Sequence, residues 1–296
     1  MIVNCVVVTY NRLSLLKECL SALSEQTYDI NKIIIVNNCS TDGTRGYLDQ
    51  FINNPKYKIL NLEQNIGGAG GFSIGLKYSV NDGADYTWIM DDDTIAKKDS
   101  LQNLIDVVNN EENVGFVCSK VVWNDNSIHL MNKPGVIEKT KMLYTPKNNS
   151  YYKCSHCSFV SVIINSAAVK KVGLPIKEFF IWYDDVEYTT RIHRNGYNGF
   201  YYPSSVVVHK TAINYSSSIE NAPKEVAERF YYHARNRCYM KRQRKNKIIF
   251  FFSLLNQYRV YLHRINKRKD DKAPFLDAVK RGCIDGWRFN PPIEFP

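Results

Sequence analysis

The chain has 296 residues, of which 44% are hydrophobic and 23% charged, and its formal net charge is +10. This composition is typical of a soluble globular protein and excludes a disordered or fibrous chain. The length suffices for one large α/β domain with an extension, or for two small domains. The longest strongly apolar run, residues 248–255, is far shorter than the roughly 20 residues of a membrane-spanning helix.

No basic segment precedes the first apolar stretch, so we predict no signal peptide and a cytoplasmic location. The positive charge is concentrated near the C-terminus, because residues 229–281 contain 16 Lys and Arg against three Asp and Glu. The rest of the chain is therefore net negative. Cys154 and Cys157 have the spacing of zinc ligands, but no second pair follows, and we expect ordinary buried cysteines.

The first part of the chain alternates between apolar runs and helical patterns. Residues 2–9 form a continuous apolar run, typical of a strand buried on both faces of a parallel sheet. Ser14 is expected to cap the helix that follows. Residues 33–36 and 57–62 predict two further strands, and a glycine-rich loop (65–71) precedes a helix at about 72–80. Residues 86–90 predict the next strand.

This alternation predicts an α/β fold with a mostly parallel sheet flanked by helices. Polar residues follow three of its strands, at positions 9–12, 37–42 and 91–93. Because ligands bind at the carboxyl ends of parallel strands, we expect a binding site at this edge. Beyond residue 115 the pattern is mixed, with strands predicted at 115–122 and 158–164, and helix beyond about 222.

Asp91 and Asp93 point to the same side of an extended chain, because they are two residues apart. Hard divalent cations such as Mg²⁺ or Mn²⁺ prefer oxygen ligands of this kind. His209, at the end of another apolar run, is a candidate third ligand. The alternative is a solvated acidic turn.

A second acidic pair, Asp184 and Asp185, follows the aromatic residues 180–183 at the start of a predicted helix. The helix dipole keeps a carboxylate there ionised, as a general base requires. Trp182 offers an apolar face on which a sugar could stack. The alternative is a helix-capping aspartate beside a core tryptophan. The glycines at 67–71 match neither the dinucleotide fingerprint nor a P-loop, but they would let a loop approach a bound nucleotide.

Together these segments resemble family 2 inverting glycosyltransferases of the GT-A fold, over about residues 3–210 and more weakly to about 289. The resemblance is carried by residues 8–12, Asn37 with Asn38, Asn65 with its glycines, the run 88–93, the run 182–188, and His209. The aspartate triplet, the Asp-Asp-x-Glu-Tyr motif and the run 232–237 are most similar to galactofuranosyl- and rhamnosyltransferases of polysaccharide assembly. The resemblance implies a GT-A (Rossmann-like) catalytic domain at 1–222 and a basic, mainly helical extension at 223–296.

Carried over residue by residue, the resemblance also implies a site. The nucleotide-sugar would be bound by Thr9, Arg12, Asn38, Asn65, Gly67, Gly71, Asp92 and Trp182. Asp91, Asp93 and His209 would hold Mn²⁺ or Mg²⁺ on the donor diphosphate. Asp185 would be the general base, with Asp184 as the alternative. Arg235 and Arg237 are further candidates for contacts to the diphosphate.

The implied activity is transfer of a sugar from a nucleotide diphosphate donor to a hydroxyl of a growing cell-surface glycan. UDP-galactofuranose is the first choice of donor, dTDP-rhamnose the second, and a UDP-linked pyranose the third. A nucleotidyltransferase is disfavoured, because residues 9–12 contain no glycine. The rival outside enzymes is a non-catalytic basic adaptor.

Residues 229–269 interleave basic and aromatic residues, which suits peripheral contact with an anionic membrane at the inner face of the cell membrane. The glycan acceptor would then be lipid-linked. A solvated helix face is the alternative. A nucleic-acid patch at 241–247 is disfavoured, because no nucleic-acid-binding fold signature accompanies it.

Overall fold

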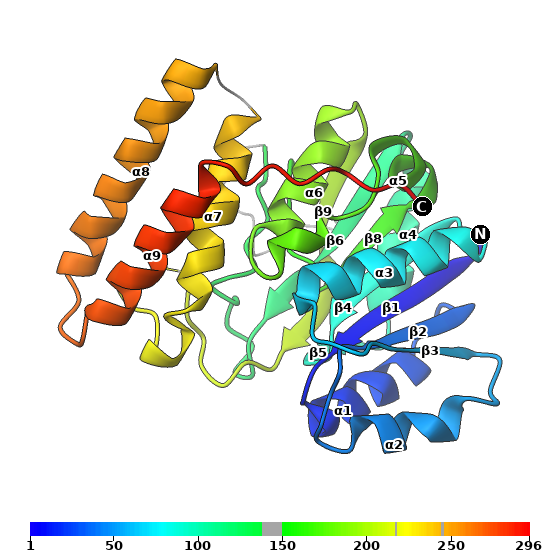
Figure 1. Cartoon of the computed structure of the whole chain (residues 1–296). Helices are drawn as coiled ribbons and strands as arrows, with labels where there is room; N and C mark the ends of the chain where they lie inside the picture. The colour runs from blue at the N-terminus through cyan, green and yellow to red at the C-terminus, as the bar shows by residue number, and fades with distance from the viewer. Residues whose placement is uncertain (138–149, 217, 244–245) are drawn as a thin grey trace.

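The computed structural model describes residues 1–137, 150–216, 218–243 and 246–296. Within these residues, a nine-stranded sheet lies between helices, and further helices follow at the C-terminus (Figure 1). The strand order is β3-β2-β1-β4-β8-β6-β9-β5, and β7 pairs with β9. The first half comprises β1 (Val3–Thr9), α1 (Leu13–Ser24), β2 (Lys32–Asn37), α2 (Thr44–Leu48), the 3₁₀ turn η1 (Asp49–Phe51), β3 (Tyr57–Asn61), α3 (Gly67–Asn81), β4 (Tyr86–Asp91), β5 (Thr94–Ala96) and α4 (Ser100–Asn110).

The second half comprises β6 (Val114–Val122), β7 (Tyr152–Lys153), β8 (Val162–Asn165), α5 (Ser166–Val172), η2 (Lys177–Phe179), α6 (Asp184–Arg194), β9 (Asn198–His209), η3 (Lys224–Val226), α7 (Arg229–Arg242), α8 (Lys247–Asn266) and α9 (Ala273–Gly286). The predicted α/β class is therefore confirmed, as is the helical C-terminus.

Strand β1 is buried on both faces, as its continuous apolar run predicts. Cys5 and Val7 belong to the core on the side of α1 and α4, whereas Val6 and Val8 belong to the core on the side of α3. Strands β3, β2, β1 and β4 pair in parallel. Their carboxyl ends therefore lie at one edge, where β1 and β4 bring Val8 opposite Asp91.

The other half of the sheet is mixed rather than parallel. Strand β8 runs antiparallel to both β4 and β6, and β5 runs antiparallel to β9, while β6 and β9 are parallel. The pairing of β5 with β9 places Thr94 opposite His209. A residue more than a hundred positions along the chain is thereby brought beside the aspartate triplet.

The predicted N-cap at Ser14 is wrong. Helix α1 begins at Leu13, so Ser14 lies inside its first turn, and Arg12 at the cap position makes no capping side-chain bond. Instead, the backbone N–H of Leu13 donates to Asp42 Oδ2 at 2.9 Å. A side chain from the loop after β2 therefore accepts a hydrogen bond from a backbone N–H group at the start of α1, the role that was expected of a local capping residue.

Helix α3 begins at Gly67, earlier than predicted, so most of the glycine run is helical. The glycines allow α3 to lie directly on β1, because a Cβ added at Gly71 would be 2.5 Å from Val8 Cγ1. Gly67 itself has φ +75° and lies against the carbonyl of Phe180. Close packing therefore requires glycine at both positions.

We expect Gly71→Ala to destabilise the protein by about 1–3 kcal/mol, because the added methyl group overpacks the α3–β1 contact. Urea unfolding followed by circular dichroism measures this. Gly46→Ala is the matched control, since a Cβ at Gly46 meets nothing within 4 Å. The control should be neutral or stabilising by up to about 1 kcal/mol. Equal stabilities of the two variants would contradict the packing argument.

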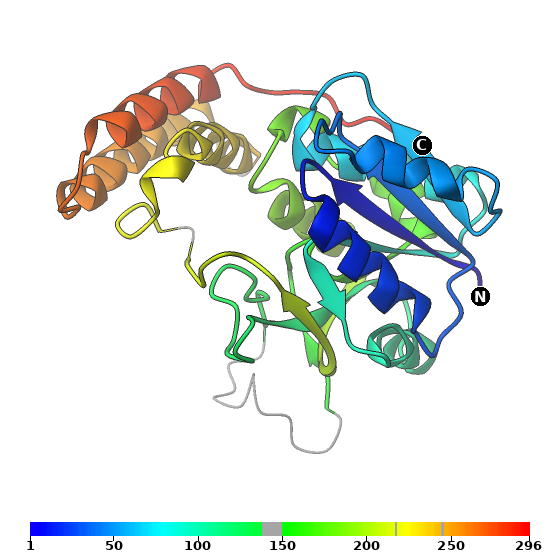
Figure 2. The same cartoon turned by 90° about the horizontal axis from the view of Figure 1, so that it is seen from below.

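Helices α7, α8 and α9 enclose a hydrophobic cluster of their own, which includes Phe230, Tyr261 and Phe275. Figure 2 shows these helices beside the sheet, with the C-terminal segment returning across to it. In that segment, Glu294 accepts a hydrogen bond from Leu174 N–H through its backbone carbonyl and pairs with Lys177 through its carboxylate. The division of the chain at residue 222 stays a prediction. None of the described helices combines the length and apolarity needed to cross a bilayer.

Candidate active site

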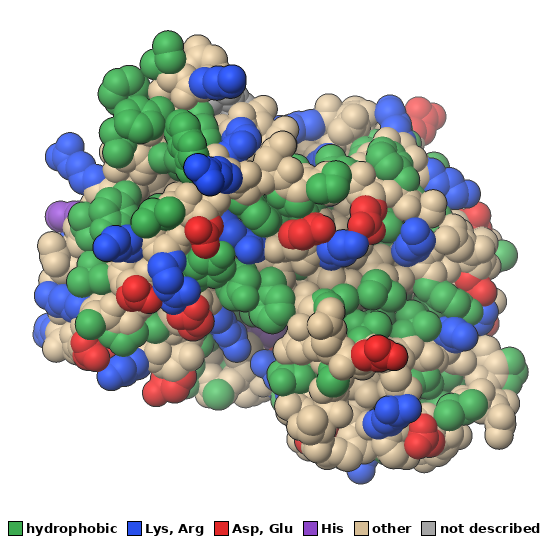
Figure 3. All heavy atoms as spheres, in the orientation of Figure 1, with side chains coloured by type: hydrophobic (Ala, Val, Ile, Leu, Met, Phe, Trp, Pro, Cys, Tyr) green, Lys and Arg blue, Asp and Glu red, His purple; other side chains and the backbone are tan. Residues whose placement is uncertain are grey.

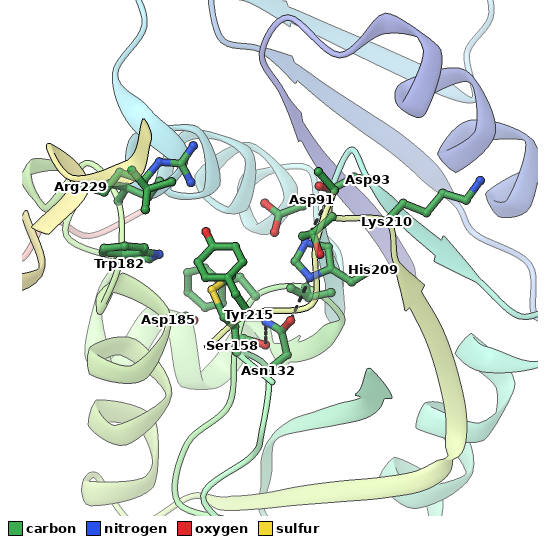
Figure 4. A pocket seen from close by; sticks show the side chains of 18 of the residues that line it. Asp91, Asp93, Asn132, Ser158, Trp182, Asp185, His209, Lys210, Tyr215 and Arg229 are labelled. Atoms are coloured by element: carbon green, nitrogen blue, oxygen red, sulfur yellow. Dashed lines mark hydrogen bonds and ion pairs between the residues drawn. The ribbon is translucent and has the colours of Figure 1, made fainter. Parts of the chain in front are cut away.

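A cavity of about 730 Å³ lies at the carboxyl edge of the sheet, between the ends of β4 and β9 and the start of α6 (Figure 4). Of the residues predicted to form the site, those lining this cavity are Arg12, Asp91, Asp93, Trp182, Asp184, Asp185 and His209. Figure 4 shows Asp91, Asp93 and His209 on one side, Trp182 and Asp185 on the other, and Lys210 pointing away. The structure thus brings the two predicted acidic clusters to a single cavity.

The ligand atoms of Asp91, Asp93 and His209 all lie within 4.8 Å of one another. His209 Nε2 is 3.1 Å from Asp93 Oδ1. Asp93 Oδ1 is buried and accepts no well-aligned hydrogen bond from the residues that the structure describes. Two carboxylates and an imidazole that converge in this way are a donor set that fits Mn²⁺ or Mg²⁺.

The aspartate triplet carries more negative charge than its neighbours compensate. Arg12 Nη1 lies 2.5 Å from Asp93 Oδ2 and 3.4 Å from Asp92 Oδ1. Burial and then the charge of Asp93 raise the pKa of Asp91 to about 6, and burial raises the pKa of Asp92 to about 7. One arginine is insufficient for three adjacent carboxylates, two of them buried, so a cation is electrostatically favoured here.

The orientation of His209 is set by Asn132, which sequence analysis missed. Asn132 Oδ1 lies 2.9 Å from His209 Nδ1, and Asn132 Nδ2 donates to Ser158 Oγ at 3.0 Å. With its Nδ1 proton donated to Asn132, His209 would offer the Nε2 lone pair to a metal ion held beside Asp93. Asn132 lies in a stretch with no periodic pattern, so the sequence carries no signal for this role.

On the opposite wall, helix α6 begins at Asp184 after a turn of unusual backbone conformation. Phe180, Trp182 and Tyr183 have φ angles of 64°, 63° and 69°. Positive φ is strained for bulky side chains and persists only where surrounding contacts hold it.

Asn236 of α7 supplies those contacts. Its Nδ2 donates to the carbonyl groups of Phe179, Ile181 and Trp182 at 2.9, 3.1 and 2.8 Å. Asn236 is fully buried. The C-terminal helices therefore fix the turn that presents Trp182 to the cavity. The run 232–237 contributes to the family resemblance, but nothing in the sequence alone singles out Asn236.

Asp185 and Asp184 differ in their surroundings. Asp184 is buried, whereas Asp185 is partly exposed in the cavity. Burial raises the pKa of Asp185 to about 6, and burial followed by the charge of Asp185 raises the pKa of Asp184 well above its ordinary value. Asp185 is therefore largely ionised near neutral pH, whereas Asp184 holds its proton more tightly than Asp185 does. Glu187 of the same motif is bound to Arg191 at 2.9 Å and is structural.

Six residues predicted to bind the nucleotide-sugar do not line this cavity: Thr9, Asn38, Asn65, Gly67, Gly71 and Asp92. Asn38 connects neighbouring segments instead, because its Nδ2 donates to the carbonyl of Gly67 and its Oδ1 accepts from Ile66 N–H. Asn65 Oδ1 accepts from Gly67 N–H at 2.9 Å. Donor contacts by these six residues stay predictions.

Two arginines of α7, Arg229 and Arg235, lie in different surroundings. Arg229 lines the cavity and lies above Trp182 in Figure 4. Arg235 donates to the carbonyls of Glu178 and Phe179 and stacks on Phe289, 3.9 Å from the ring centroid. These contacts give Arg235 a structural role, and its contact to the diphosphate stays a prediction.

Curated relatives are sugar transferases and synthases. Galactofuranosyltransferase GlfT1 of Mycobacterium tuberculosis is 26% identical over 197 residues, which are 64% of this chain and 64% of that one. The chain thus covers slightly less than two thirds of GlfT1. The dTDP-rhamnosyl transferase RfbF of Shigella flexneri is 25% identical over 301 residues, 96% of this chain and 97% of that one.

Solved structures of low sequence identity share the fold. GalNAc-T7, crystallised with UDP, GalNAc and Mn²⁺, gives a TM-score of 0.61 at 16% identity, over 80% of this chain and 51% of that one. The mannosyltransferase PcManGT of Pyrobaculum calidifontis, in complex with GDP-Man and Mn²⁺, gives a TM-score of 0.57 at 18% identity. The match covers 95% of this chain and 73% of that one. These similarities establish a GT-A-like fold.

The sequence model of glycosyl transferase family 2 matches residues 5–173, which is more than half of the chain. This segment contains most of β1, the whole of β2, β3 and β4, and the aspartate triplet. The chain therefore belongs to glycosyl transferase family 2.

Proposed function

We propose that this protein is an inverting, metal-dependent glycosyltransferase that moves a sugar from a nucleotide diphosphate donor to a hydroxyl of a growing glycan. The observation that carries the proposal is the arrangement of one cavity, with Asp91, Asp93 and His209 on one wall and Asp185 on the other. Inverting transfer needs a base on the side opposite the leaving diphosphate, and the position of Asp185 across the cavity supports this role.

Asp185 takes the proton of the acceptor hydroxyl, and the hydroxyl oxygen attacks the anomeric carbon of the donor. The bond from that carbon to the diphosphate oxygen breaks, and its electron pair leaves with the nucleoside diphosphate. A single displacement inverts the anomeric configuration. Asp91, Asp93 and His209 would hold Mn²⁺ or Mg²⁺, which would neutralise charge on the leaving diphosphate. Trp182 provides a flat apolar face for the sugar ring.

The proposed donor is UDP-galactofuranose, with dTDP-rhamnose as the alternative. The names of GlfT1 and RfbF support this pair, since the former is a galactofuranosyl- and the latter a rhamnosyltransferase.

Calorimetric titration with UDP and with dTDP, each with and without Mn²⁺, tests the proposal. We expect Mn²⁺-dependent binding of UDP, because the carboxylate pair alone repels a diphosphate. Stronger binding of dTDP would select rhamnose. Binding of neither nucleotide by folded protein would remove the transferase proposal and favour the non-catalytic adaptor.

The proposed acceptor is lipid-linked, and the protein lies at the inner face of the cell membrane. Supporting this is an exposed apolar patch at the start of α8, where hydrophobic side chains gather beside Lys and Arg (Figure 3). Its residues are Ile248, Ile249, Phe251, Phe252, Leu255 and Trp287. Ile248 is 71% and Phe252 63% exposed. Basic charge around exposed apolar groups suits an anionic membrane surface.

We expect the double variant Ile248→Ser, Phe252→Ser to bind phosphatidylglycerol vesicles at least about tenfold more weakly, because each side chain contributes roughly 1.5–3 kcal/mol when buried. Vesicle co-sedimentation measures this. Ile52→Ser is the control, since Ile52 is 61% exposed but belongs to the segment between η1 and β3. Equal binding by both variants would exclude the patch as the membrane contact.

A further inference from the structure

A second cavity, of about 360 Å³, lies between α7, α8 and the turn before α6. Its lining includes Tyr183, His233, Arg237, Tyr261 and Arg264. Tyr183 and His233 also line a side pocket of about 180 Å³, whose other walls include Trp182 and Asp185. None of the three proposed metal ligands lines either space. The second cavity therefore shares Tyr183 and His233 with the side pocket, and that side pocket reaches the proposed base.

The second cavity is positively charged. Arg237 and Arg264 form no ion pair with a carboxylate among the described residues, whereas Arg12, Arg191, Arg268 and Arg281 all do. His233 is neutral, because burial and then the charges of Arg237 and Arg264 lower its pKa to about 3. Two guanidinium groups without a counter-charge on one cavity favour binding of an anion.

Contacts connect this cavity to the wall that carries the base. The hydroxyl of Tyr261 lies 2.5 Å from His233 Nδ1, and Tyr261 and Arg237 line the same cavity. The His233 ring lies 4.9 Å from the ring of Tyr183 and 5.6 Å from that of Trp182, between centroids. An anion bound by the arginines would therefore lie next to the residues that precede Asp185.

We infer that the second cavity binds a phosphate or diphosphate group of the acceptor and so places the acceptor hydroxyl at Asp185. Guanidinium forks and a tyrosine hydroxyl match phosphate oxygens in geometry and charge. The inference rests on the proposed transferase function, which assigns the donor diphosphate to the opposite wall. It deepens that function by making the acceptor an anionic, phosphate-bearing glycan.

The anion site is separate from the apolar patch on the same helix. Arg264 lies near the end of α8, whereas Phe252 lies near its start. At 1.5 Å per residue the two are about 18 Å apart along the helix axis. The apolar patch and the anion cavity are therefore two distinct sites on α8, and a variant of one leaves the other intact.

Titration of the protein with inorganic pyrophosphate in EDTA, followed by calorimetry and tryptophan fluorescence, tests the inference. We expect saturable binding that Arg264→Gln weakens about tenfold and Arg237→Gln at least as much. Arg259→Gln is the matched control, because Arg259 is an exposed arginine of the same helix that lines neither cavity. It should change the dissociation constant less than twofold. Equal weakening by the control, or no saturable binding, would overturn the inference.

Two further arms identify the source of the phosphate. At fixed free Mn²⁺, pyrophosphate should slow transfer to a membrane-extract acceptor, and added donor should not relieve the inhibition. Relief by donor would place pyrophosphate in the donor site and overturn the inference. A loss of phosphatidylglycerol-vesicle binding in Arg264→Gln, with unchanged pyrophosphate affinity, would assign the cavity to lipid headgroups instead.

The Mn²⁺-dependent UDP titration separates this inference from the proposed function. Arg264→Gln should leave UDP affinity unchanged. If wild-type protein binds pyrophosphate but no nucleotide, the transferase proposal fails while the anion cavity stands. If it binds UDP but no pyrophosphate, the transferase proposal stands and the anion cavity fails.

Discussion

Asp185→Asn is expected to lower the rate of sugar transfer by about 10²–10⁴-fold, the usual contribution of a positioned general base. The amide cannot accept the acceptor proton, yet it preserves the size of the side chain and its place at the start of α6. UDP affinity in the presence of Mn²⁺ should stay within about twofold, because Asp185 lies on the wall opposite the proposed metal ligands. The rate is measured as release of nucleoside diphosphate from the donor selected by titration.

Asp184→Asn is the control for that variant. Burial and the charge of Asp185 raise the pKa of Asp184 well above its ordinary value, so the neutral form of Asp184 is favoured and an amide resembles that form closely. Its effect on the rate should be less than about tenfold. A larger loss in Asp184→Asn than in Asp185→Asn would transfer the role of base to Asp184.

The pH profile of the wild-type enzyme gives an independent check on the same residue. Burial raises the pKa of Asp185 to about 6, and the base acts only when deprotonated. The rate should therefore rise with pH and reach half its maximum near pH 6. An ordinary exposed aspartate would give a midpoint near pH 4. The rise should be absent from the residual rate of Asp185→Asn.

Asp93→Asn is expected to remove the Mn²⁺-dependent part of UDP affinity, with a loss of about 100-fold or more. Asp93 contributes a full negative charge at the centre of the triad, and it also pairs with Arg12 at 2.5 Å. Loss of several kcal/mol of charge stabilisation corresponds to at least two decades in affinity. Calorimetry with and without Mn²⁺ measures the effect.

The matched control is Asp99→Asn, an exposed aspartate a few residues along the chain that makes no capping side-chain bond. UDP affinity should be unchanged in this variant. Direct Mn²⁺ binding, followed by electron paramagnetic resonance, separates loss of the cation from loss of the nucleotide. Undiminished Mn²⁺ binding in Asp93→Asn would exclude Asp93 as a ligand.

The sequence by itself determined the parallel half of the sheet and the position of its ligand-binding edge. Residues 5–8 and 33–36 are apolar without interruption, and only burial on both faces accommodates such strands. Polar residues directly after those strands, and after β4, must then lie together. The aspartate triplet could therefore be placed at this edge from the sequence, because the strands before it and before the other polar segments are predicted from local pattern alone.

Tertiary structure determines which residues from the rest of the chain lie beside the aspartates at that edge. His209 lies beside Asp93 because β5 pairs antiparallel with β9, and Asn132 reaches His209 from a segment without periodic pattern. The start of α1 is likewise capped by Asp42, which tertiary structure brings there, and not by Ser14 as the local sequence predicts. Each of these contacts joins residues far apart in sequence. Strand register and loop path fix them, and local hydrophobic periodicity contains no information about either.

The wall that carries Asp185 was likewise decided by packing across the chain. The sequence placed acidic residues at a helix start, but the strained turn before them is held by Asn236 from α7. The anion cavity behind that turn exists only because α7 and α8 bring Arg237 and Arg264 together. The basic composition of the C-terminal segment indicated charge there. Only the packing of its helices decided which charges stay unpaired and face the site.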